Sequence, residues 1–262
     1  MTFDPWSVVT TKQAEIAKRF LADRERDRAH LVIYLSGAHA YGFPSPDSDL
    51  DLKCVHIAPT SRLVGLSLAS DPNDRIEVID GVELDYGSNE LAGVLRGAIK
   101  GNGNYLERIL GELVLGGDAA LLAEARAVVT PVLSRRVANH YGGFATSQLR
   151  AFDDKPTAKR ALYVLRTAAT GRHLLGTGEL VTDVTRLRSL APPELDELLA
   201  IKRSGETSQL APDHAEVWRV RLVDAIAAVD AAVAASPLPA EPPDDAIAAV
   251  DSWLRDVRRA RW

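Results

Sequence analysis

Cysteine is nearly absent from this chain, since Cys54 is the only one among 262 residues. A single cysteine excludes an intramolecular disulfide and a zinc site built from several thiolates. Long apolar runs are also missing, because no uninterrupted stretch of about eighteen apolar residues occurs, which argues against a membrane-spanning helix. The first twenty residues carry charges throughout and lack the apolar core of a secretory signal. We therefore predict a cytoplasmic protein that spans no membrane.

The overall composition is that of an ordinary folded protein, with 46% apolar and 26% charged residues, which excludes a disordered or fibrous chain. The net charge of −5 argues against a protein coated with basic surface for duplex DNA. Charge is nevertheless uneven, because residues 130–205 hold 12 Lys or Arg and 7 Asp or Glu. This basic middle either meets phosphate groups or is a solvated helical surface.

The chain length allows one large domain or two modest ones. Short apolar runs at residues 30–37 and 50–58 predict two strands, and residues 76–87 predict a hairpin that turns at Asp80-Gly81. After residue 118 the strand signal nearly vanishes, and amphipathic helical patterns follow one another. We therefore predict an α+β fold, in which a small mixed sheet with flanking helices (residues 1–118) precedes an all-α domain (residues 119–262).

Two carboxylates mark the beginning of the second predicted strand. Asp49 and Asp51 are separated by Leu50, so both acids face one side of the strand while the leucine faces the core. Adjacent carboxylates repel each other unless a positive charge lies between them, and Mg²⁺ prefers carboxylate and phosphate oxygens. Asp85, in the second strand of the predicted hairpin, is the candidate third acid. The pattern predicts a divalent metal site of the kind that supports phosphoryl transfer.

A glycine turn lies on the other side of the predicted cleft. Gly37 ends the first predicted strand, and Gly42 follows in a segment that reads as a loop or broken helix. Glycine lets a backbone approach phosphate oxygens closely, and backbone N–H groups attract anions. A D-x-D pair alone is weak evidence; strand, glycine turn, acidic pair and later strand acid together are much more specific.

Residues 36–53, SGAHAYGFPSPDSDLDLK, resemble the motif of the DNA polymerase β-like nucleotidyltransferase superfamily, in which a small-residue turn precedes two aspartates. More narrowly, the chain is similar to the RNA repair pathway polymerase β family, and the likeness continues through residues 85–110 and into the helical half. The resemblance implies a nucleotidyltransferase catalytic domain over residues 1–118. The helical domain over residues 119–262 would then close the nucleotide cleft.

The resemblance implies an enzyme that transfers a nucleoside monophosphate from a nucleoside triphosphate to an acceptor hydroxyl and releases pyrophosphate. The catalytic and metal-binding residues are then Asp49, Asp51 and Asp85, with Mg²⁺ or Mn²⁺ as cofactor. The residues expected to contact the nucleotide belong to the glycine turn, the acidic loop and one face of a later helix: Ser36, Gly37, Ala38, Tyr41, Ser48, Lys159, Tyr163 and Arg166. Ala38 departs from the family pattern, which usually has glycine or serine there.

The acceptor is left open by the sequence. An RNA end fits the family and the basic middle of the chain, a protein hydroxyl fits the same chemistry, and a small-molecule alcohol is a third choice. A non-catalytic nucleotide-binding regulator is the alternative of a different class, and Ala38 is the main evidence for it. The preferred triphosphate and the oligomeric state cannot be read from one sequence.

Overall fold

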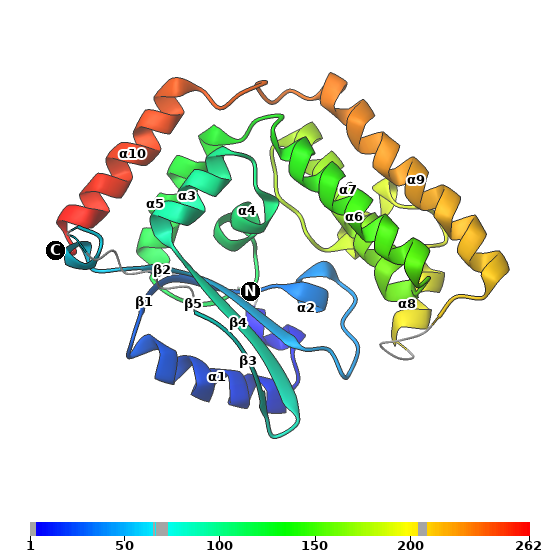
Figure 1. The fold of residues 1–262 in the computed structure, drawn as a ribbon, viewed down its shortest axis with the longest axis horizontal. Coiled ribbons are helices and arrows are strands. Elements are labelled where there is room, and N and C mark those ends of the chain that lie inside the picture. The colour runs from blue at the N-terminus through cyan, green and yellow to red at the C-terminus, as the bar shows by residue number, and fades with distance from the viewer. Residues whose placement is uncertain (1–3, 65, 67–72, 204–208) are drawn as a thin grey trace.

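The computed structural model describes residues 4–64, 66, 73–203 and 209–262. Its centre is a five-stranded mixed sheet with the strand order β3-β4-β2-β1-β5 (Figure 1). The strands are β1 (Ala29–Leu35), β2 (Leu50–Ile57), β3 (Asn73–Ile79), β4 (Val82–Glu90) and β5 (Val114–Gly116). The predicted α+β class is therefore confirmed.

The register of β2 and β4 positions the acids that the sequence singled out. These two strands run parallel and place Asp51 directly opposite Asp85. The β3–β4 hairpin turns at Asp80-Gly81, where both residues have positive φ, as a tight two-residue turn requires. The predicted hairpin and its turn are thus confirmed.

One face of the sheet is covered by α1 (Thr11–Glu25). A capping box between Thr10 and Gln13 fixes the start of this helix. Its apolar face packs on alternate residues of the central strands, among them Leu50 and Leu52 of β2. Because side chains alternate along a strand, Asp51 must face the other side of the sheet.

Three helices cover that other face: α3 (Leu91–Ile99), α4 (Gly103–Leu110) and α5 (Ala119–Val129). The short helix α2 (Gly37–Tyr41) follows β1 directly, where the sequence predicted a loop or broken helix. Strand β5 was not predicted, because three residues between two helices carry almost no periodic signal and pairing with β1 alone defines them.

The remaining helices form a bundle beside the sheet: α6 (Val137–Asp154), α7 (Ala158–Thr177), α8 (Leu195–Arg203) and α9 (Pro212–Ala235). The last helix, α10 (Asp244–Arg259), returns to pack on α3 and α5 at the far end of the sheet (Figure 1). The division after residue 118 stays a prediction, and the C-terminal helix lies with the sheet unit. Among the described residues, none of the helices is long and apolar enough to cross a bilayer.

Candidate active site

The site begins with the paired carboxylates on the sheet face that α1 leaves uncovered. Asp51 and Asp85 are direct neighbours on parallel strands, which lie about 4.8 Å apart. Asp49 immediately precedes β2 and is close enough to affect the charge of Asp51. The tertiary structure therefore places Asp51 beside Asp85, with Asp49 near enough to Asp51 to raise its pKa.

A lysine from the same strand balances part of this negative charge. Lys53 Nζ lies 2.7 Å from Asp85 Oδ1. Burial raises the pKa of Asp51 to about 6, and the nearby Asp85 and Asp49 charges add to the shift while Lys53 and Lys159 oppose it. The ionised form of Asp51 is therefore disfavoured in this buried position, and a nearby cation would stabilise it.

Gly37 packs directly against the Asp51 carboxylate. Its φ is +65°, and a Cβ built on it would lie 1.8 Å from Asp51 Oδ2. The Ser36 backbone N–H also donates to the Asp51 carbonyl over 2.8 Å. The turn after β1 therefore fixes the acid, which is a second reason for glycine besides the predicted approach to phosphate.

Replacement of Gly37 by alanine is expected to cost activity and stability together. The methyl group collides with Asp51 Oδ2, and positive φ costs a non-glycine residue about 1–2 kcal/mol. Gly81→Ala is the matched control, because Gly81 has φ +78° but nothing within 4 Å of its Cβ position. Both variants should be less stable in urea denaturation, and only Gly37→Ala should lose turnover. If the two variants turned over substrate equally well, Gly37 would not be needed to position Asp51.

The loop before Asp49 is anchored from two distant elements. Ser48 Oγ accepts a 2.9 Å hydrogen bond from the Ser45 backbone N–H, and Gln13 of α1 donates to the Ser48 carbonyl over 3.1 Å. Lys202 of α8 is completely buried, and its Nζ donates to Ser45 Oγ over 2.6 Å. Ser48, predicted to contact nucleotide or to orient Asp49, lies in this buried network.

A cavity of about 230 Å³ opens beside the carboxylates, between the sheet and the helical bundle. It is lined by Tyr34, Ser36, Gly37, Tyr41, Asp51, Lys53, Asn104, Glu107, Arg108 and Tyr163. Four of these, Ser36, Gly37, Tyr41 and Tyr163, belong to the predicted nucleotide-binding set. The cavity thus unites the glycine turn, the acidic strand and helix α7.

The aromatic wall of the cavity comes from both halves of the chain. Tyr163 of α7 packs edge-to-face on Tyr41 and Phe43, with ring centroids 5.7 and 5.6 Å away. Lys159 lies one helical turn before Tyr163 and is close enough to Asp51 to lower its pKa. The predicted helical face therefore meets the acids through Lys159 and the cavity through Tyr163.

Arg166, which belongs to the same predicted face of α7, forms a buried ion pair with Glu107 of α4. It is 2% exposed, and its Nη1 donates to Glu107 Oε1 over 2.8 Å. Its guanidinium also lies 3.6 Å from the Tyr41 ring centroid. Arg166 does not line the cavity. Its role in the structure is the buried ion pair with Glu107, and the nucleotide contact stays a prediction. Ala38 is likewise buried, at 7% exposure, in the apolar core.

A divalent cation is the group that the family chemistry implies here. Within the described parts of the chain, no three His, Cys, Asp or Glu side chains come together as a metal-binding group. The donors nevertheless suit such an ion, because Asp51 and Asp85 offer oxygens side by side and the ammonium of Lys53 occupies the position of a counter-cation.

Comparison with known protein families matches residues 14–256 to the RNA repair pathway DNA polymerase beta family. The chain belongs to this family. This membership confirms the resemblance to the polymerase β-like nucleotidyltransferase superfamily that residues 36–53 carry.

Two relatives illustrate the breadth of the similarity. An uncharacterized protein of Methanocaldococcus jannaschii is 27% identical over 164 residues, which are 61% of this chain and 66% of that protein. The chain thus spans slightly less than two thirds of this curated relative. The crystal structure of a nucleotidyltransferase-like protein from Exiguobacterium sibiricum is a remote likeness, with 9% identity and a TM-score of 0.34 over 95% of this chain and 80% of that one.

Several residues at the site were missed from the sequence, among them Lys202 and Glu107. Lys202 lies about 150 positions from the acidic loop that it supports, and Glu107 meets Arg166 and Tyr41 only through tertiary packing. A buried charge has no periodic signal of its own. The one available cue was that each lies within an otherwise apolar helical face, where a charged residue needs a partner.

Proposed function

We propose that this protein transfers a nucleoside monophosphate from a nucleoside triphosphate to an acceptor hydroxyl at the end of an RNA. The single observation that carries the chemistry is the register of Asp51 opposite Asp85, next to a cavity that includes the glycine turn. The family description supports RNA as the acceptor.

Each acid has a role in this proposal. Asp49, Asp51 and Asp85 hold Mg²⁺ or Mn²⁺, which would supply positive charge to the triphosphate and to the attacking oxygen. Asp85 accepts the proton of the acceptor hydroxyl at a carboxylate oxygen, once Lys53 has left its ion pair. Lys53 is then available to the phosphate oxygens of the nucleotide, where an ammonium stabilises negative charge.

The remaining residues bind and orient the nucleotide. The Gly37 turn and Ser36 border the space for the triphosphate, and Lys159 adds positive charge near the acids. Tyr41 and Tyr163 form an aromatic wall against which a base or sugar packs. Such positioning reduces the entropic cost of bringing two substrates together.

The proposal is tested by incubating the protein with each labelled triphosphate, Mg²⁺ or Mn²⁺, and a cell extract separated into RNA, protein and small solutes. We expect label in RNA, pyrophosphate release, and loss of both with Asp85→Asn. Label in protein or in a small solute would overturn the RNA assignment and keep the transferase. Saturable nucleotide binding with no pyrophosphate release from any fraction would favour the non-catalytic regulator and overturn the proposal.

A further inference from the structure

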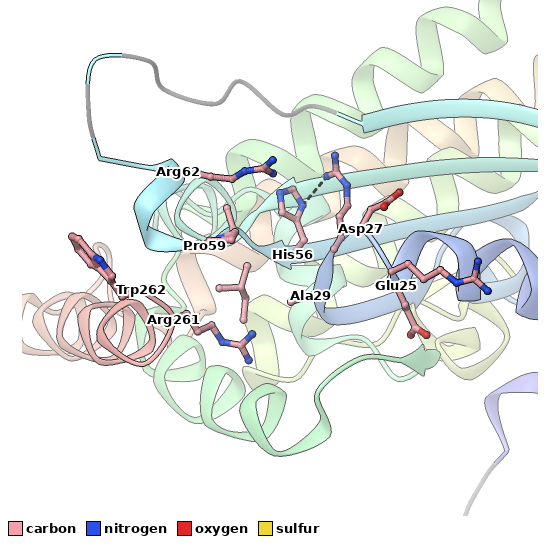
Figure 2. Close-up of a pocket in the computed structure, with 12 residues that line it drawn as sticks. Glu25, Asp27, Ala29, His56, Pro59, Arg62, Arg261 and Trp262 are labelled. Carbon is pink, nitrogen blue, oxygen red and sulfur yellow. Dashed lines mark hydrogen bonds between the residues drawn. The ribbon is translucent and has the colours of Figure 1, made fainter.

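A second, strongly basic cavity lies at the opposite end of the sheet from the carboxylates. Its volume is about 410 Å³. It is formed by the turn between α1 and β1, the end of β2, and the C-terminal residues (Figure 2). Four arginines line it: Arg26, Arg28, Arg62 and Arg261. None of them belongs to the nucleotidyl-transfer site.

The charge of this cavity is unusual for a chain of net charge −5. The lining residues include two acids, Glu25 and Asp27, so arginine side chains outnumber acidic side chains by two. Arg261 lies 3.5 Å from Asp118, and the side chains of this pair are 34% and 42% exposed, so solvent weakens the pairing. Arg26 likewise lies 3.5 Å from Asp23, with both side chains more than two thirds exposed, so a ligand anion could compete for these guanidinium groups.

A buried histidine, His56, lines the back of the cavity. His56 is 2% exposed, its Nδ1 is 2.8 Å from Ser88 Oγ, and Arg28 Nη1 lies 3.3 Å from the same nitrogen. Figure 2 shows Arg62 reaching toward His56, with a dashed line joining the histidine to a neighbouring side chain. Burial, with smaller contributions from His56 and Arg28, lowers the pKa of the adjacent His30 to about 4.

Guanidinium groups suit one class of ligand in particular. Their planar donors match phosphate oxygens in pairs, and they stay charged at all physiological pH values. Trp262 lies at the rim of the cavity and is 80% exposed, so an aromatic face is available to an unstacked base. Phosphodiester groups with attached bases satisfy both features.

We propose that this arginine cavity binds the phosphodiester backbone of the RNA acceptor, several nucleotides away from the reacting end. This inference rests on the proposed function. Asp51 and His56 are five residues apart along β2 and lie on opposite faces of the sheet, so the two sites are separated by at least about 17 Å at about 3.3 Å per residue. At about 3.4 Å per stacked nucleotide along one strand, an RNA that reaches both sites needs at least about five nucleotides between them.

The test compares Arg62→Ala with wild type on a dinucleotide and a twelve-nucleotide RNA. Arg62 is exposed, and Arg150→Ala, which replaces an exposed arginine on α6, is the matched control. For the long RNA we expect KM to rise about three- to tenfold and the salt slope of binding to fall by about one. For the dinucleotide, KM and kcat should stay unchanged, and Arg150→Ala should resemble wild type throughout.

Binding of the long RNA is also measured in an Asp51→Asn background, so that the arginine cavity is tested without turnover. If Arg62→Ala weakens RNA binding in the Asp51→Asn background, the arginine cavity is an RNA-binding site. This result does not depend on labelling of an acceptor, so it can be distinguished from a failure of the proposed function. Equal effects on short and long RNA, or none on either, would overturn the inference. Loss of free mononucleotide or inorganic phosphate binding with RNA binding intact would also overturn it, and would identify the cavity as a small-anion site.

Discussion

Asp51→Asn is expected to lower nucleotidyl transfer by about a thousandfold or more while it makes the metal-free protein more stable. The loss of activity follows from the position of Asp51, which lies between Asp49 and Asp85 and lines the cavity. Removing one charge from such a set takes away stabilisation that the transition state needs, and single charge-stabilising groups are commonly worth about 10²–10³ or more in rate.

The gain in stability follows from the raised pKa of the same carboxyl. Burial holds the Asp51 pKa at about 6, above its ordinary value of 3.8, so the folded state binds the proton more tightly than the unfolded state. The folded protein therefore loses stability as pH rises from about 4 to about 6, and above that range the ionised group costs about 1–3 kcal/mol. A neutral asparagine removes this cost.

The measurement is urea denaturation with EDTA at pH 4.5 and pH 7.5, alongside turnover with Mg²⁺. The advantage of Asp51→Asn over wild type should be present at pH 7.5 and small at pH 4.5. Glu83→Gln is the matched control, because Glu83 is an exposed acid of β4 and its replacement should change neither quantity much. Near-normal turnover of Asp51→Asn would refute the assignment of Asp51.

Wild-type activity should depend on pH through the same group. At subsaturating Mg²⁺, turnover should rise as pH increases through about 6, because an ionised Asp51 is needed to hold a cation. Saturating Mg²⁺ should move this rise to lower pH, since the metal competes with the proton. If the pH at which turnover rises were the same at all Mg²⁺ concentrations, the proton and the metal would not share Asp51 as their binding site.

Arg166→Met is expected to destabilise the protein by about 3–5 kcal/mol, because it leaves a buried carboxylate without its partner. Both side chains of the Glu107–Arg166 pair are 3% exposed, and their atoms are 2.8 Å apart. Tyr41 also donates to Glu107, from Oη to Oε2 over 3.3 Å. The pair links α4 beside the sheet to α7 of the helical bundle, so its loss should also loosen the wall of the cavity.

The double variant Glu107→Gln with Arg166→Met separates charge from packing. If the cost is that of an unpaired charge, the double variant should recover much of the stability lost in Arg166→Met. Urea denaturation measures both, and Arg150→Ala on the exposed side of α6 serves as the control. A double variant no more stable than Arg166→Met would show that the arginine acts through packing, for instance on the Tyr41 ring 3.6 Å away.

The sequence was most informative where local pattern and chemistry coincide. Alternation along residues 50–58 predicted a strand with its acids on one face, and Asp80-Gly81 predicted the hairpin turn, because both depend on neighbours in the chain. Lys53 lies on the same face of β2 as Asp51 and forms an ion pair with Asp85. The segment at α2 was less clear, since a five-residue helix between two glycines has too little periodicity to detect.

By itself the sequence determined the α+β class, the β3–β4 hairpin and the family, because each of these depends on patterns within short segments of the chain. Only the tertiary structure decided that Asp85 lies opposite Asp51, that Arg166 is bound to Glu107, that Lys202 supports the acidic loop, and that the C-terminal arginine joins three others across the sheet. These are contacts between distant segments, and strand register, burial and charge pairing are settled by how the whole chain packs.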